Sequence, residues 1–90
     1  MEKNQIKQKI SAMLDVPKEI VLNLPVISMV GMQDLTIENY KGIIEYTDER
    51  IRISTASGIM RVEGKGLGLR QITAEAVSIS GRVARIEFMV

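Results

Sequence analysis

The chain has 90 residues, of which 46% are hydrophobic, so it can form one small aliphatic core and does not have the composition of a disordered protein. Twelve basic residues against eleven acidic ones give a net charge of +1, which favours neither nucleic acid nor an acidic partner. The absence of cysteine and histidine excludes disulfides, thiolate catalysis, histidine bases and the usual zinc ligands.

The first 24 residues are expected to form a helical segment. Apolar residues recur there at helical spacing and make one stripe: Ile6, Ile10, Met13 and Leu14. This stripe can face the core, or it can dock on a membrane surface or a partner. Pro25 ends the segment, because the residue before a proline is pushed into extended geometry. No apolar run typical of a signal peptide or a membrane span is present, which predicts a cytoplasmic protein.

Residues 25–90 have the period of two that is typical of strands. The expected strands lie in VISMVGM, DLTIEN, GIIEYT, RIRIST, IMRVEG, LGLRQI, AVSIS and RVARIEF, most of them separated by turn signals such as Ser80–Gly81. One segment, RQITAEAV, could form a helical turn instead. The predicted fold is one mainly β domain: an antiparallel meander forming a small twisted sheet, sandwich or barrel, after an N-terminal amphipathic α-helix.

Three expected hairpin tips predict the register between residues 35 and 64: Tyr40–Lys41, Asp48–Glu49 and Ser57–Gly58. The resulting pairs are Ile37–Ile44, Leu35–Tyr46, Tyr46–Ile51, Ile44–Ile53, Ile53–Val62 and Thr55–Met60. All of them keep the large apolar side chains on one face, which is the condition that specifies register.

The opposite face of these strands is expected to carry a ladder of charges. Glu45 should lie across from Arg52, and Arg52 across from Glu63, as favourable cross-strand pairs. Carboxylates beside an arginine on a solvated face do not make the acid and base of a carboxylate enzyme, which need a cleft. The sequence therefore predicts a protein that is not an enzyme, with no catalytic residue, no metal site and no cofactor.

A glycine-rich run, Gly64 to Gly68 around Lys65, invites comparison with phosphate-binding loops. Such loops need their glycines between a strand and a helix, and a Walker loop needs Ser or Thr after Gly-Lys. Here Gly66 follows Lys65, and the next segment alternates like a strand. The run is interpreted as a turn or bulge, and no nucleotide or other small-molecule substrate is expected.

The order and spacing of several segments resemble the YabP/YqfC family of sporulation proteins, from about Asp15 to the end of the chain. The segments are LPVISMVG, IENYKGI, GIMRVEGKGL, ISGRV and IEF, and the short helical lead and the IEN turn are closer to the YqfC branch. The positions that carry the resemblance are Leu24, Pro25, Met29, Gly31, Glu38, Asn39, Gly42, Gly58, Gly64, Lys65 and Gly81.

This resemblance implies a non-catalytic protein of an endospore-forming bacterium that acts in spore envelope or cortex assembly, as an adaptor or a self-associating component. It implies location in the mother-cell cytoplasm or at the forespore membrane surface. The implied partners are proteins of the sporulation machinery, a membrane protein among them. The alternative function is a small nucleic-acid-binding β-barrel, although such a barrel needs stacking aromatics and a basic groove.

Strand edges are the expected protein-contact surface. The first expected strand carries no charge and the last is strongly apolar, so either edge can accept another strand, unless the sheet closes into a barrel. A homo-oligomer or a strand-paired complex is therefore expected. The candidate contact residues on these edges are Val26, Ser28, Val30, Met32, Ala84, Ile86 and Phe88. Glu38 and Lys65 are further candidates, because they are polar and have no evident turn role.

Overall fold

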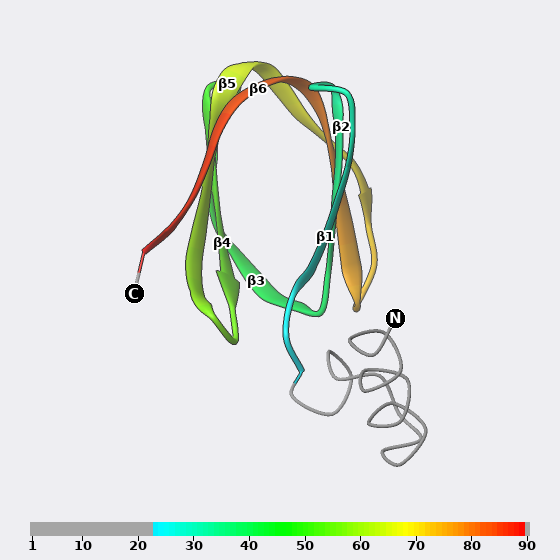
Figure 1. Ribbon diagram of the computed structural model, residues 1–90, viewed down its shortest axis with the longest axis vertical. Coiled ribbons are helices and arrows are strands. Elements are labelled where there is room, and N and C mark those ends of the chain that lie inside the picture. The colour runs from blue at the N-terminus through cyan, green and yellow to red at the C-terminus, as the bar shows by residue number, and fades with distance from the viewer. Residues whose placement is uncertain (1–22, 90) are drawn as a thin grey trace, which may run out of the picture.

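The computed structural model describes residues 23–89, which form six antiparallel strands in one open sheet (Figure 1). The strands are β1 (Val26–Val30), β2 (Asp34–Glu38), β3 (Tyr40–Tyr46), β4 (Arg50–Thr55), β5 (Gly58–Ile72) and β6 (Ala76–Met89). Their spatial order is β1-β2-β6-β5-β4-β3. The mainly β prediction is confirmed, and the predicted N-terminal helix falls on residues outside the described part.

β5 and β6 are long because each one joins two of the expected strands. The turn expected at Ser80–Gly81 is wrong, since β6 runs through it, and the glycine run lies inside β5. The ladder between these strands shifts register at Glu63/Gly64 and at Lys65/Gly68, and such bulges bend a strand. Figure 1 shows the two strands arching over the top of the molecule, so that their ends descend in separate legs.

This bend folds the sheet into two layers around one core. One layer holds β3, β4, the first half of β5 and the second half of β6; the other holds β1, β2 and the remaining halves. The buried side chains are Leu35, Ile37, Ile51, Ile53, Met60, Val62, Leu67, Val77, Ile79 and Val83. Because successive strand residues face opposite sides, a period of two in the sequence becomes one aliphatic core.

β2 and β3 do not form the hairpin expected at Tyr40–Lys41. Asn39 has a φ of 64°, and its N–H donates to the carbonyl of Glu75 at 2.7 Å, so the chain turns a corner between the layers. The expected pairs Ile37–Ile44 and Leu35–Tyr46 are therefore wrong. β2 lies between β1 and β6 instead, where Leu35 pairs with Met29 and Ile79. Only β3 to β6 form a meander.

A bulge in β3 changes part of the predicted register. The Asp48–Glu49 tip is confirmed, since Tyr46 pairs with Ile51. Between Ile43 and Glu45 the ladder shifts, so Ile43 takes the place expected for Ile44 across from Ile53. Ile44 is consequently 46% exposed instead of buried.

The β4–β5 tip is at Ala56–Ser57, one residue before the expected position, because Thr55 pairs with Gly58. Ile53 therefore pairs with Met60, so the expected Ile53–Val62 and Thr55–Met60 pairs are wrong by two residues. A shift of two residues keeps every side chain on its face, and the predicted core members of these strands are all buried.

A threonine begins each of the three two-residue tips, at Thr47, Thr55 and Thr73. Its hydroxyl accepts the N–H two residues later, at 3.2, 3.0 and 3.2 Å respectively, and donates to the carbonyl three residues later. Such side-chain turns compete with the extended backbone and fix where a strand ends. The threonines are the sequence signal that would have placed all three tips.

Candidate functional site

The predicted contact residues lie on three separate parts of the sheet. Val26, Ser28 and Val30 belong to β1, with Met32 in the turn that follows it. Ala84, Ile86 and Phe88 belong to the second half of β6. Glu38 ends β2 and pairs with Val26 of β1, and Lys65 lies in the bend of β5. Figure 1 shows the end of β6 leaving one leg while β1 lies in the other, so these positions do not form one patch.

β1 is an outer strand of the sheet, because it pairs with β2 alone among the described strands. Its exposed apolar side chains are Ile27, Met29 and Val30, and Val30 is 72% exposed. Ile27 and Met29 were not among the predicted contact residues. The predicted residues were the alternate positions Val26, Ser28, Val30 and Met32, whereas the structure leaves both faces of this strand largely open.

β6 changes from a central strand to an edge along its length. Residues 76–80 lie between β2 and β5, whereas residues 85–89 pair with β5 alone among the described strands. The last contact on the other side is the N–H of Val83, which donates to the carbonyl of Met32 at 2.9 Å. Beyond Val83 this side of β6 has no strand against it within residues 23–89.

β3 is the remaining outer strand, and the opposite layer partly covers it. The Tyr40 hydroxyl donates to the carbonyl of Thr73 at 2.7 Å, which ties the start of β3 to the β5–β6 tip. At the other end, the N–H of Leu67 donates to the carbonyl of Asp48 at 2.8 Å. One hydrogen bond therefore ties each end of β3, or the turn next to it, to the opposite layer, whereas no such bond is found along β1 or along residues 85–89 of β6 among the described residues.

The outward face of β3 to β6 carries a network of ion pairs, called here the charged face. The Glu45–Arg52 pair is confirmed, with Oε1 and Nε 2.7 Å apart. The Arg52–Glu63 pair is wrong, because the two-residue register difference puts Arg61 across from Arg52. The remaining pairs are Arg50–Glu45 at 3.2 Å, Arg61–Glu63 at 3.3 Å, Arg61–Glu87 at 2.6 Å, Arg85–Glu63 at 2.9 Å and Arg85–Glu87 at 3.9 Å.

These pairs make the stability of the domain depend on pH. A hydrogen bond from Arg52 lowers the pKa of Glu45, and one from Arg61 lowers the pKa of Glu87. A carboxyl whose pKa is lower in the folded state stabilises the fold at pH values above its unfolded pKa, which is about 4.3 for glutamate. That contribution disappears as the pH falls through the folded pKa.

We therefore expect Glu45→Gln to lower the melting temperature at pH 7, where the wild-type carboxylate is charged and paired. At pH values below the folded pKa the wild-type side chain is also neutral, so the two melting curves should converge. Thermal unfolding followed by circular dichroism across this pH range measures the difference. A gap in melting temperature that stays constant down to the lowest pH would mean that Glu45 contributes through packing and not through its charge.

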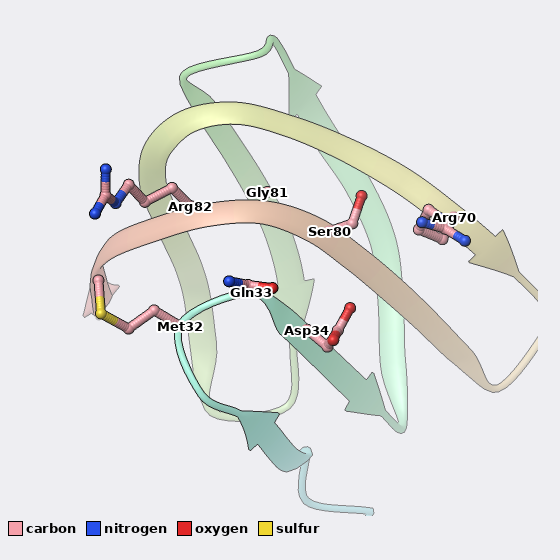
Figure 2. A pocket seen from close by; sticks show the side chains of 7 residues that line it. All are labelled: Met32, Gln33, Asp34, Arg70, Ser80, Gly81 and Arg82. Atoms are coloured by element: carbon pink, nitrogen blue, oxygen red, sulfur yellow. The ribbon is translucent and has the colours of Figure 1, made fainter.

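A shallow hollow lies beside the turn between β1 and β2, against the bent parts of β5 and β6 (Figure 2). Its lining residues are Met32, Gln33, Asp34, Arg70, Ser80, Gly81 and Arg82. Figure 2 shows the two arginines at opposite ends, with Asp34 between them. With one carboxylate in its lining, the hollow lacks the pair of acids that a carboxylate enzyme needs. Sequence reasoning missed the hollow because three distant segments build it.

Among residues 23–89 no group of three acids lies close enough together to hold a metal ion. In the same part of the chain there is no helix of the length and apolarity required to cross a membrane.

Comparisons with known proteins agree on one family. The model of the YabP family matches residues 23–89, the same range that the structure describes. The chain is also similar to the uncharacterized protein YqfC of Bacillus subtilis (strain 168), with 25% identity over 87 residues, 97% of this chain and 94% of that protein. No solved structure matches significantly.

Proposed function

This chain belongs to the YabP family, and we propose that it is a non-catalytic sporulation protein that works by binding other proteins through the open edges of its sheet. Its place of action is the mother-cell cytoplasm or the forespore membrane surface, and its role is in assembly of the spore envelope or cortex. It serves there as an adaptor or as a self-associating component.

The open edges are the observation that carries this proposal. β1 and residues 84–89 of β6 each have one side without a strand against it among the described residues. Unpaired N–H and C=O groups on such edges accept a strand from another chain. β1 has no charged residue to discourage pairing, and Val30 and Phe88 add exposed apolar surface beside the two edges.

The distribution of polar groups also favours binding over catalysis. Thr55 is the single buried polar side chain among the described residues, and its hydroxyl is engaged in the β4–β5 turn. Active sites place polar or ionisable groups in a partly desolvated cleft, where their chemistry is altered. The arginines and glutamates of the charged face lie on an open surface instead, where they pair with one another.

The first test is genetic and uses an endospore-forming host whose own copy of this gene has been deleted. We expect the deletion strain to yield fewer heat-resistant spores with a complete cortex, and expression of the wild-type chain to restore the yield. A tagged copy should retain proteins from sporulating mother cells. Val30→Lys, which puts a charge on the β1 edge, should retain less, while Lys41→Arg on β3 serves as the control.

Normal envelopes in the deletion strain would contradict the proposal. A mobility shift of nucleic acid that weakens steeply with salt would instead favour the nucleic-acid-binding alternative, because phosphate contacts release counterions.

A further inference from the structure

We propose that two copies of this chain associate through residues 84–88 of β6, which pair antiparallel about a two-fold axis at Ile86. The inference rests on the proposed function and deepens it, since it names a second copy of the chain as the occupant of one open edge. It also specifies which residues face each other.

Among residues 23–89, the backbone groups of this edge that meet no other strand belong to Ile86 and Phe88. Along a strand, residues that face the same side also point their N–H and C=O groups toward the same neighbour. Val83 faces the core, and its N–H points away from β5 to Met32. Ile86 also faces the core. It is three positions after Val83, and regular alternation would put the two on opposite faces, but the register shift at Ala84 adds one residue and brings Ile86 back to the core side. The N–H of Ile86 therefore points away from β5, and the N–H of Phe88, two residues later, points the same way.

The charges on the outward side of the edge select one register. In an antiparallel pair about a two-fold axis, outward residues oppose outward residues, because the pleats must match. An axis at Arg85 or at Glu87 would place like charges across from each other. An axis at Ile86 places Arg85 of each copy across from Glu87 of the other, which is the favourable arrangement. Both side chains are available for this, being 62% and 45% exposed.

The same axis joins the charged faces of the two copies. Within one copy, Arg61 pairs with Glu87 at 2.6 Å and Glu63 pairs with Arg85 at 2.9 Å. Across the axis, one row of side chains becomes Arg61, Glu87, then Arg85 and Glu63 of the second copy. The signs alternate over four strands, so no like charges become neighbours along this row.

The length of the free edge fits this register as well. Phe88 is 38% exposed, and the residue that comes to lie across from it in the second copy is Ala84, the small residue at the register shift, which has no partner on β5. The Met32–Val83 hydrogen bond closes the edge at one end, so pairing can run from Ala84 to Phe88, and Ile86 is the middle of that stretch. β1 is also open, but it carries no charge that would set a register.

Cysteine cross-linking tests the register directly, because the wild-type chain contains no cysteine. We expect an equimolar mixture of Arg85→Cys and Glu87→Cys to form a disulfide dimer under mild oxidation. These positions would be directly opposite, at about 4.5 Å between Cα atoms, within the disulfide range. The mixed dimer also keeps one Arg85–Glu87 pair.

Each of these variants alone should cross-link at least about tenfold less, since residues two positions out of register lie about 8 Å apart. Ser28→Cys at the centre of β1 is the control for the other open edge, and it should stay monomeric. Cross-linking of Ser28→Cys, or equal cross-linking in all mixtures, would overturn the proposal.

A matched pair of substitutions at Ile86 tests the free amide. Ile86→Pro removes an N–H that does not bond to β5, so the chain should fold and its dimer dissociation constant should rise at least about tenfold. Ile86→Ala keeps the amide and should remain dimeric. Sedimentation across a concentration series, with circular dichroism for folding, measures both.

A wild-type chain that stays monomeric at high micromolar concentration would refute this dimer, whatever the sporulation assay shows. A strain with normal envelopes and an intact dimer in vitro would contradict the proposed function and leave the dimer standing.

Discussion

Gly64→Ala should destabilise the domain by about 3 kcal/mol or more, a large part of the roughly 5–15 kcal/mol that holds a domain of this kind folded. A Cβ at this position would overlap the carbonyl oxygen of Arg82 and lie 3.1 Å from the Cα of Val83, both backbone atoms of β6. The backbone of a paired strand cannot move aside without disturbing the β5–β6 bend, on which the two layers depend.

Gly42→Ala is the matched control, because nothing lies within 4 Å of its added Cβ and its φ is ordinary. Its stability should stay within about 0.5 kcal/mol of wild type. Gly66→Ala should fall between the two at about 1 kcal/mol, since the space is open but its φ of 62° favours glycine. Urea denaturation followed by circular dichroism ranks the three variants. Equal stability of Gly64→Ala and Gly42→Ala would contradict the close approach of the strands at this bend.

Ile53→Ala should cost about 2–5 kcal/mol, because its side chain is fully buried between the two layers and its removal leaves a cavity. Ile44→Ala removes the same atoms from a side chain that is 46% exposed, and it should cost less than about 1 kcal/mol. Urea unfolding of the two variants compares them under one condition. Equal losses would restore the simple register in which Ile44 faces the core, and would rule out the bulge at Ile43 and Glu45.

Local features of the sequence determined most of the strands and much of the core. Alternation placed Leu35, Ile37, Ile51 and Val62 on one face, and all four are buried. The Glu45–Arg52 pair could be predicted because a two-residue tip joins its strands and leaves little choice of register. The family resemblance likewise came from turns and strands in sequence order, and the family match supports it.

The tertiary structure alone decided which strands are neighbours and which edges stay open. A period of two tells which residues share a face, but the pattern is the same whichever strand lies alongside. Pairing β2 with β6 brings together residues 38 to 46 positions apart, and the free energy gained by this pairing depends on the whole core closing at once. The glycine run forms a bend in β5 because β6 lies directly against it. Residues 84–89 lie at an edge because the pairing of β2 with β6 stops at Ser80. Both outcomes depend on what stands across from a residue, and no local pattern in the chain contains that information.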